Sequence, residues 1–304
     1  MNDSSPAVQI RPFLPETVGR VLDKAGLWDS LEEIRFRINR PVQLICTYKE
    51  CFLTESVISR EMLNITFQKI SGYSAYACRE ELKEGFITLP GGHRAGLCGR
   101  VYTDSEGCRQ IRDITSMNIR VARQMPGCCR SVLNLLVENE LFPDTMIISP
   151  PGFGKTTLLR DLIRHLSDGF GSFPGKRVSV VDERGELADV TREGESFYLG
   201  KRTDVLDRCP KAEGMLLMVR SMNPEIIAAD EIGSREDIEA MKVIRNSGCS
   251  LLITVHGRDP EEVLEKPGLG PYLKDRPFRR YLVIKKKRGG ERMTVVYDEK
   301  GRIL

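Results

Sequence analysis

The stretch from Ile147 to Thr157 restricts the possible folds of this chain more than any other segment. It reads Ile-Ile-Ser-Pro-Pro-Gly-Phe-Gly-Lys-Thr-Thr, an apolar strand followed by a Gly-rich loop and the start of a helix. The phosphate-binding loop pattern is G-x-x-x-x-G-K-[ST], and the chain matches it except that Ser149 replaces the first Gly. A chance Gly-rich turn is the alternative, but strand, loop and helix follow one another in the order that a phosphate loop requires.

The pattern has a physical basis in the way backbone amides bind phosphate. Successive N–H groups must turn inward around the anion, and small residues let the backbone come close to it. The helix that begins after Gly154 also presents the positive end of its dipole to the phosphates. We therefore predict that Lys155 reaches the β- and γ-phosphates of a nucleotide and that the Thr156 hydroxyl ligates Mg²⁺. The predicted nucleotide-binding residues are Ser149, Pro150, Pro151, Gly152, Phe153, Gly154, Lys155, Thr156 and Thr157.

Three further apolar runs each end in polar residues. The runs and the residues that follow them are 177–181 with Asp182 and Glu183, 226–229 with Asp230 and Glu231, and 251–255 with His256. Such runs are typical of parallel strands that are buried on both faces. Ligands of these sheets bind beyond the carboxyl ends of the strands. We therefore expect the acidic residues, His256 and Lys155 to converge in one crevice.

The acidic pair after residues 226–229 has the form of the second nucleotide motif. Asp230 is expected to hold the Mg²⁺ shell, directly or through water. Glu231 is placed to orient and deprotonate the water that attacks the γ-phosphate. An ordinary acidic turn is the alternative for this pair. His256 is either a γ-phosphate sensor or water-orienting group, or a structural histidine with satisfied hydrogen bonds.

Two arginines flank the acidic strand. Arg220 lies near the end of a predicted helix just before it, and Arg235 opens the predicted helix just after it. Both side chains could reach the phosphates, within their own subunit or across a subunit boundary. Surface arginines in ion pairs are the alternative for each.

The chain is expected to form two domains, because its 304 residues exceed the usual size of one. Pro126-Gly127 is a plausible hinge, so we predict a small α+β domain over residues 1–125, with no catalytic set of its own, and an α/β domain over 126–304. The N-terminal elements expected are strands 33–38, 42–46, 86–89, 95–102 and 119–123, with a helix over 16–28 and a helical stretch over 59–84 that breaks around Gly72. The further C-terminal elements expected are helices 131–139, 156–167, 210–222 and 234–246, with hairpin strands 281–284 and 293–297.

Two polar turns have open interpretations. His93 and Arg94 lie at a predicted hairpin tip and are expected to be exposed, with a contact to a neighbouring subunit as the alternative. The basic run 285–288 is expected to be a solvated turn. A contact with anionic lipid or nucleic acid is the alternative, but four charges form only a small patch.

Composition limits the classes of partner and compartment. The 46 Lys and Arg against 43 Asp and Glu give a net charge of +3, which does not by itself argue for nucleic acid. Nine irregularly spaced cysteines, including the adjacent pair Cys128-Cys129, predict reduced thiols in a cytosolic protein without a zinc site. The polar N-terminus has no signal-peptide pattern, and no apolar run approaches the roughly 20 residues that cross a bilayer. Any membrane role is expected to involve a partner or a surface patch.

Four segments together resemble a known family. They are Ser-Pro-Pro-Gly-Phe-Gly-Lys-Thr-Thr, Val-Val-Asp-Glu-Arg-Gly-Glu, Arg-Ser-Met-Asn-Pro-Glu-Ile-Ile-Ala-Ala-Asp-Glu-Ile-Gly and Thr-Val-His-Gly. With these segments, and over essentially its whole length, the chain resembles the stage III sporulation protein AA family of the secretion-system traffic ATPases. That superfamily consists of RecA-like motors, so the resemblance implies a C-terminal RecA-like P-loop ATPase domain behind the smaller N-terminal domain.

The resemblance also implies roles for particular side chains. Secretion ATPases carry an acidic box between the two nucleotide motifs and a histidine box after the second. Here it implies that Glu183 and Glu186 help to place the water or metal, and that His256 senses the γ-phosphate. Arg220 matches an arginine that completes the site in those motors. Arg120 and Arg123, near the domain junction, are weaker candidates for the same role. The chain departs from the family pattern at two positions: Ser149 replaces Gly, and Arg184 stands where many secretion motors have Pro.

The function implied is a Mg²⁺-dependent ATPase that powers assembly or transport by a secretion-like membrane channel during sporulation. ATP and Mg²⁺ are the implied cofactors. The implied partners are further copies in a hexameric ring and membrane-embedded channel components, with the protein cytoplasmic and peripherally attached to the membrane. A nucleic-acid-stimulated motor and a non-hydrolysing ATP-binding scaffold are the alternatives. The small net charge argues against the first, and intact Lys155, Asp230 and Glu231 argue against the second.

Overall fold

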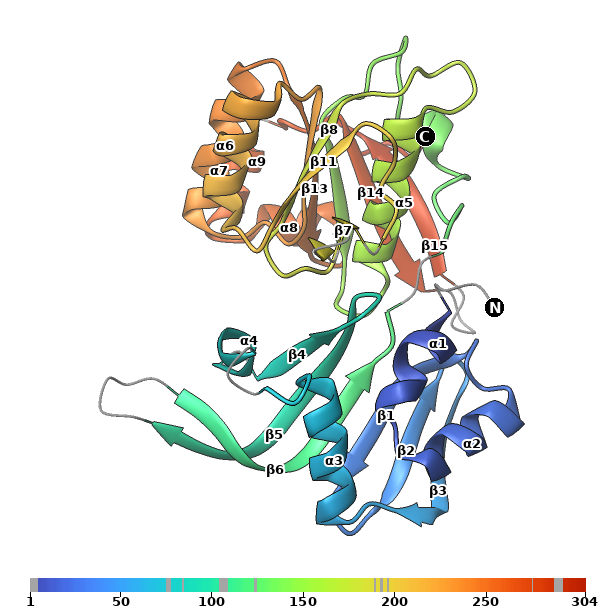
Figure 1. Cartoon of the computed structure of the whole chain (residues 1–304). Coiled ribbons are helices and arrows are strands. Elements are labelled where there is room, and N and C mark those ends of the chain that lie inside the picture. Colours follow the sequence, from blue (N-terminus) through green and yellow to red (C-terminus); the bar gives the residue numbers. More distant parts are fainter. Residues whose placement is uncertain are drawn as a thin grey trace. The chain divides into compact units, whose positions relative to one another are not determined.

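The chain forms two compact units, which comprise Met1–Arg123 and Gln124–Leu304. A computed structural model (Figure 1) describes residues 5–74, 78–83, 85–103, 109–122, 125–188, 190–191, 194–195, 197–274, 276–286 and 292–304. The boundary expected from the sequence, between residues 125 and 126, lies two residues further along the chain than the division between the units. Across the described ranges, no helix combines the length and the apolar character that crossing a bilayer requires.

Unit 1 is built on a six-stranded sheet with the order β3-β2-β1-β6-β5-β4, in which neighbouring strands run antiparallel. Its strands are β1 (Leu31–Arg37), β2 (Pro41–Cys46), β3 (Lys49–Val57), β4 (Phe86–Leu89), β5 (His93–Thr103) and β6 (Arg109–Arg120). Its helices are α1 (Pro6–Ile10), η1 (Arg11–Phe13), α2 (Glu16–Ala25), α3 (Arg60–Ile70) and α4 (Arg79–Lys83).

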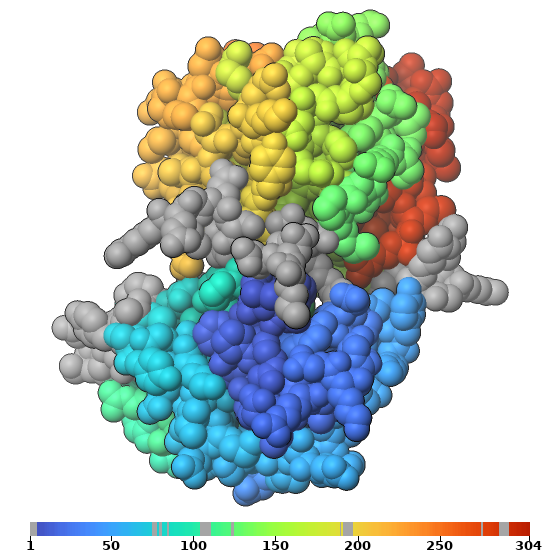
Figure 2. All heavy atoms as spheres, turned by 45° about the vertical axis from the view of Figure 1, so that its right-hand side comes forward, coloured from blue at the N-terminus to red at the C-terminus, as the bar shows by residue number. Residues whose placement is uncertain are grey.

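The core of unit 1 follows from the alternation of its strands. Val42 and Leu44 of β2 are buried, while Gln43 between them is only partly covered. Helix α2 adds Val18 and Leu22 to the same core. Figure 2 shows the N-terminal part of the chain, in dark blue, on the surface of this unit. The expected α+β character therefore comes from helices that pack on an antiparallel sheet.

Two strands of unit 1 differ from the expectation. β3 was not predicted because it lies at the edge of the sheet, where most of its side chains are exposed and show no apolar alternation. β6 begins at Arg109, ten residues before the predicted start, because its first half pairs with β5 in a long hairpin. Pairing between distant segments defines both elements, and a local pattern does not report it.

The expectation that His93 is exposed at a hairpin tip is wrong. His93 opens β5 and is only 1% exposed. Its Nδ1 accepts a hydrogen bond from the Ala122 amide at 2.8 Å, and its Nε2 lies 3.0 Å from Gln9 Oε1. Arg94 places its guanidinium 4.0 Å from the centre of the Phe86 ring. His93 therefore ties the N-terminal helix to the end of the sheet, which makes it a structural residue of unit 1.

Unit 2 is an α/β unit on a seven-stranded sheet with the order β11-β8-β12-β13-β7-β14-β15. All neighbours run parallel except β14 and β15. Its strands are β7 (Thr145–Ser149), β8 (Val178–Asp182), β11 (Thr203–Asp207), β12 (Ile226–Ala229), β13 (Ser250–His256), β14 (Arg280–Lys286) and β15 (Arg292–Asp298), with a separate pair β9 (Val190–Thr191) and β10 (Gly194–Glu195). Its helices are η2 (Leu133–Leu135), α5 (Lys155–Asp168), α6 (Lys211–Met222), α7 (Arg235–Asn246), α8 (Pro260–Leu264) and α9 (Leu269–Leu273).

Helices cover both faces of this sheet. Helix α5 lies on one face, and α6, α7 and α9 lie on the other (Figure 1). Along β7, Ile147 joins the core beneath α5, whereas Met146 and Ile148 join the core beneath α6 and α7. The prediction of buried parallel strands at residues 177–181, 226–229 and 251–255 is confirmed.

The predicted helix over residues 131–139 is wrong. The structure has a short 3-10 turn at Leu133–Leu135 and then a bridge between Glu138 and Leu141. Asn139 and Glu140 have φ values of 47° and 63°, which no right-handed helix contains. The apolar residues of this segment still pack on the α5 side of the sheet, so their helical spacing reports burial and not regular structure.

Candidate functional site

The phosphate-binding loop connects β7 to α5 at the carboxyl edge of the sheet. Gly152 and Gly154 have φ values of 75° and 87°, in the left-handed region that favours glycine. A Cβ at Gly152 would meet no atom within 4 Å, so the loop leaves open space on that side. Helix α5 starts at Lys155 with no capping side chain and no acidic residue in its first turn. The positive end of this 14-residue helix is thus left to a ligand.

The order of the strands decides which side chains meet Lys155. β13 lies between β7 and β12, so His256 at its end lies between Lys155 and Glu231. The Lys155 Nζ is 3.0 Å from His256 Nδ1 and 3.7 Å from Glu231 Oε1. The His256 Nε2 is 2.9 Å from the same Glu231 oxygen. One proton on Nε2 satisfies both contacts, because Nδ1 then accepts from the lysine and Nε2 donates to the carboxylate.

A second group of contacts joins the loop helix to the acidic strand. The Thr156 hydroxyl donates to Asp230 Oδ2 at 2.7 Å, and the Thr254 hydroxyl donates to the other Asp230 oxygen. The Glu231 amide donates to Thr254 Oγ1 at 2.8 Å. Thr254 therefore orients both acidic residues from the neighbouring strand β13. Sequence reasoning missed this role, and the only signal was a threonine two residues before His256.

The loop after β8 is held by Asp182. This carboxylate accepts hydrogen bonds from the amides of Glu186, Leu187 and Ala188 at 2.8 to 2.9 Å. Asp182 was expected to reach the crevice, and it lies beside Asp230 and Glu231, but both of its oxygens bind amides of its own loop. Glu183 pairs with Lys211 at the start of α6. The small cavity between this loop and β12 is lined by Asp182, Glu183, Arg184, Glu186, Lys211, Asp230 and Glu231.

Arg220 does not reach this site within its own subunit. Helix α6 starts at Lys211, which pairs with Glu183 at the carboxyl edge of the sheet. At the other end of α6, the Asn223 carbonyl accepts from Arg177 Nε, just before β8 begins at the amino edge. Arg220 is exposed near that far end. Only its action across a subunit boundary remains as a prediction.

The other basic candidates lie elsewhere. Arg235 is exposed at the first residue of α7, four residues after Glu231. In unit 1, Arg120 is exposed and lies 3.8 Å from Glu33, and Arg123 falls outside the described residues. Of the basic run 285–288, Lys285 donates to the Tyr297 hydroxyl at 3.0 Å, and residues 287 and 288 fall outside the described residues.

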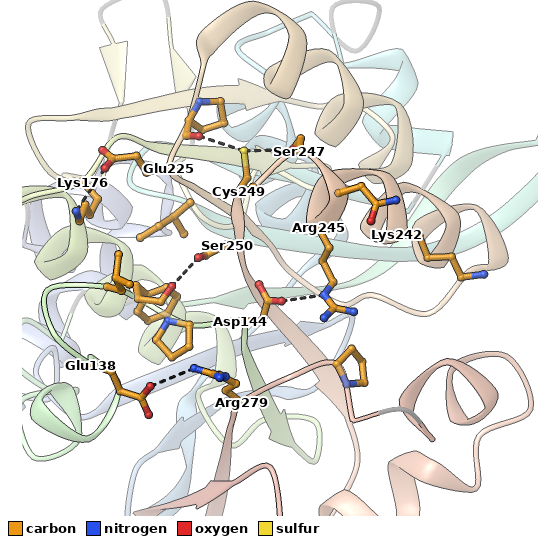
Figure 3. Close-up of a pocket in the computed structure, with 18 of the residues that line it drawn as sticks. Glu138, Asp144, Lys176, Glu225, Lys242, Arg245, Ser247, Cys249, Ser250 and Arg279 are labelled. Atoms are coloured by element: carbon orange, nitrogen blue, oxygen red, sulfur yellow. Dashed lines mark hydrogen bonds and ion pairs between the residues drawn. The ribbon is translucent and has the colours of Figure 1, made fainter.

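A separate groove of unit 2 lies at the opposite edge of the sheet. It has a volume of about 1240 Å³ and is lined by charged side chains that pair with one another. Figure 3 shows Arg245 directed at Asp144, 3.0 Å away, and Arg279 directed at Glu138, 3.4 Å away. Because the strands deliver Lys155, His256 and Glu231 to the carboxyl edge, this groove does not contain the candidate site.

Burial and ion pairing set the charge states at the site. Burial lowers the pKa of Lys155, although Asp230 and Glu231 oppose this effect. Burial would raise the pKa of Glu231, but Arg184, Lys155 and His256 outweigh it, so the pKa of this carboxyl is lowered. The site thus holds the Lys155 ammonium and the Glu231 carboxylate close together, with little of either side chain exposed.

The residues present fit a nucleotide with Mg²⁺. The left-handed glycines, the uncapped helix start and the buried Lys155 ammonium suit a polyphosphate. The Thr156 hydroxyl and the Asp230 carboxylate, already in contact, are the oxygen ligands that Mg²⁺ prefers. Sequence reasoning also missed Arg292, whose guanidinium lies against the loop at Gly154. A Cβ added to Gly154 would be only 2.6 Å from its Nη1.

Comparisons with known proteins give matches over most of the chain. The family model for sporulation stage III, protein AA matches residues 6–304. Stage III sporulation protein AA of Bacillus subtilis (strain 168) is 40% identical over 298 residues, which cover 97% of this chain and 96% of that protein. A more distant relative is Protein SEEDLING PLASTID DEVELOPMENT 1 of Arabidopsis thaliana, 24% identical over 87% of this chain and 36% of that protein.

Solved structures share the fold. The ATPase DotB of Legionella pneumophila matches with a TM-score of 0.62 and 16% identity, over 93% of this chain and 80% of that one. DotB of Yersinia pseudotuberculosis gives 0.65 and 14%, over 95% and 81%. The pilus retraction motor PilT with bound ADP gives 0.59 and 14%, over 91% and 81%. The fold is therefore the α/β fold of RecA-like secretion ATPases.

Proposed function

The chain belongs to the sporulation stage III, protein AA family, and from this premise we propose that it is a Mg²⁺-dependent ATPase that powers assembly or transport by a secretion-like membrane channel during sporulation. The proposal includes a homo-oligomeric ring, hexameric as the family resemblance implies, and membrane-embedded channel components as partners. Its chemical part rests on the residues of unit 2, and its biological part rests on the family.

One observation carries the chemical part. Three strands and one helix bring Lys155, His256 and Glu231 to within 3.7 Å of one another, beside the Thr156–Asp230 contact. Mg²⁺ held there would neutralise charge on the phosphate oxygens. Lys155 binds the same oxygens, and Glu231 orients and accepts a proton from the attacking water. His256 touches both side chains, so it can report the position of one to the other.

The remaining roles are proposed on weaker contacts. Glu183 and Glu186 line the small cavity that Asp230 and Glu231 also line, which supports the proposal that they position water or metal. Arg220 is proposed to act on a neighbouring subunit, because its exposed position at the far end of α6 suits a contact between subunits and not one with its own loop.

The test is phosphate release from Mg-ATP by the purified chain beside Glu231→Gln and Lys155→Ala, with oligomer mass followed by light scattering. We expect Glu231→Gln to lower kcat about 100-fold or more while ATP still binds, because it removes the general base. Lys155→Ala is expected to abolish hydrolysis. Glu239→Gln is the matched control, since Glu239 is an exposed carboxylate that pairs with Lys242 on α7.

Normal turnover in the Lys155→Ala or Glu231→Gln protein would refute the proposed roles. Assembly driven by ATP without phosphate release in any variant would favour the non-hydrolysing scaffold. Stimulation of turnover by DNA or RNA that falls steeply with salt would favour the nucleic-acid motor.

A further inference from the structure

Arg184 lies in the loop that follows β8, at the carboxyl edge of the sheet in unit 2. It follows Glu183, which pairs with Lys211, and precedes Gly185, whose φ of 64° turns the chain. Asp182 fixes the rest of the loop through the three amides that donate to it. The backbone on both sides of Arg184 is therefore anchored, while 54% of its side chain is exposed.

From this loop the side chain of Arg184 crosses to the end of β12. Its Nη1 lies 2.5 Å from Glu231 Oε2. The other oxygen of the same carboxylate faces His256 Nε2 at 2.9 Å and Lys155 Nζ at 3.7 Å. Two basic side chains from different elements thus meet at one carboxylate. Lys155 is the residue that reaches the β- and γ-phosphates in loops of this pattern.

We propose that Arg184 is a phosphate-binding residue of this site, contributed by the same subunit, which distinguishes a nucleoside triphosphate from a diphosphate. The proposal rests on the proposed nucleotide-binding function and adds a residue to it. Arg184 lies at the Glu231 end of the site, which is the γ-phosphate end if Glu231 orients the attacking water. The bond to Glu231 joins one nitrogen to one oxygen, whereas a guanidinium can bind phosphate oxygens through two.

A second role for Arg184 would produce a similar loss of triphosphate binding. If Arg184 only neutralised Glu231, removing it would leave a bare carboxylate that repels the γ-phosphate. The two roles predict different results once the charge of Glu231 is removed. In the Glu231→Gln variant there is no carboxylate charge for Arg184 to neutralise, so removing Arg184 weakens triphosphate binding only if Arg184 binds the phosphate directly.

The experiment measures equilibrium binding of Mg-ATPγS and Mg-ADP to the full chain by titration calorimetry. The variants are Arg184→Gln, Arg184→Lys, Glu231→Gln and the double variant Arg184→Gln/Glu231→Gln. Arg302→Gln is the matched control, because Arg302 is an exposed arginine in an ion pair with Asp298 at 2.6 Å, remote from the loop in sequence. Circular dichroism checks that each variant is folded.

We expect Arg184→Gln to weaken ATPγS binding about 10- to 100-fold and to leave ADP binding within about twofold. The same loss is expected in the Glu231→Gln background, and Arg184→Lys is expected to recover part of the affinity because it keeps the charge but not the fork. Equal effects on ATPγS and ADP, or a loss that vanishes in the Glu231→Gln background, would overturn the proposal. A wild-type chain that binds nucleotide without hydrolysing it would refute the ATPase and leave this test intact, whereas one that binds no nucleotide would refute both.

Discussion

At the scale of single residues, the site depends on Glu231 being held in an unusual backbone conformation. Its φ of 55° lies in the left-handed region, which costs a residue with a Cβ about 1 kcal/mol or more. Two hydrogen bonds to the neighbouring strand β13 offset this cost. The Glu231 amide donates to the Thr254 hydroxyl, and the Ile232 amide donates to the Thr254 carbonyl. The backbone strain therefore coincides with the proposed catalytic carboxylate.

Thr254→Val should impair hydrolysis while preserving the fold. Valine has nearly the same shape, but it leaves the Glu231 amide and one Asp230 oxygen without their hydroxyl partner, at a cost of about 1–3 kcal/mol. We expect kcat to fall by at least about tenfold, measured as phosphate release. Thr254→Ser keeps the hydroxyl and should restore most of the activity. Turnover unchanged in the valine variant would show that Thr254 does not orient the acidic pair.

At the scale of elements, α5 links the phosphate loop to the segment that precedes β7. Asp161 on α5 accepts the amides of Gly127 and Cys129 at 2.9 Å each, and Arg164 donates to it at 2.6 Å. His165 lies 3.8 Å from the same carboxylate, but Arg164 already places a cation there. These contacts of Asp161 with Gly127, Cys129 and Arg164, called the latch below, therefore join α5 to the start of unit 2 and do not form a metal site.

Asp161→Asn should destabilise unit 2 and remove part of its acid sensitivity. Burial would raise the pKa of Asp161, but hydrogen bonds from Cys129, Gly127 and Arg164 outweigh it and lower the pKa to about 2, from an ordinary 3.8. A depressed pKa means that the carboxylate contributes its full stability above pH 3.8 and loses it as the pH falls toward 2. The contribution amounts to about 2 kcal/mol.

Urea unfolding of wild type and Asp161→Asn between pH 2 and pH 7 measures this effect. The difference in the free energy of unfolding should be largest at pH 7 and shrink as the pH falls below 4. Asp168→Asn, on the last residue of the same helix, is the comparison variant outside the latch. A difference that is the same at every pH would show that the charge of Asp161 does not hold the latch.

At the scale of the whole molecule, the two units have separate hydrophobic cores. The core that contains Ile34 belongs entirely to unit 1, and the two cores on the faces of the parallel sheet belong to unit 2. Among the described residues, Lys155, Thr156, Asp230, Glu231 and His256 of the proposed nucleotide site all lie in unit 2. Stability and ligand binding are therefore expected to be divided between the units.

Calorimetric unfolding should resolve this division. Ile34→Ala is expected to lower the transition of unit 1, and Leu282→Ala that of unit 2, each by about 2–5 kcal/mol because both side chains are fully buried. Mg-ADP should raise only the transition that Leu282→Ala lowers, by about 3 kcal/mol at 100 times its Kd. A single transition that shifts as a whole in both variants would contradict independent units.

The sequence by itself determined the elements that local pattern controls. The phosphate loop, the buried runs before Asp182, Asp230 and His256, and the terminal hairpin were all predictable, because burial on two faces and Gly-rich turns leave a mark within a few residues. The prediction of Lys155 and Glu231 as site residues came from the same patterns. The edge strand β3 and the segment 131–139 were not predictable, since exposure hides a strand and burial without regular structure imitates a helix.

Only the tertiary structure decided which side chains meet. The insertion of β13 between β7 and β12 places His256 between Lys155 and Glu231, and strand order depends on pairing between segments about 100 residues apart. Contacts made only in the folded chain also decide the positions of three other residues. Asp182 binds the amides of its own loop, Arg220 lies at the far edge of the sheet, and Arg184 pairs with Glu231. A local pattern specifies the element on which a residue lies, but the side chain's neighbours depend on contacts that only the folded chain makes.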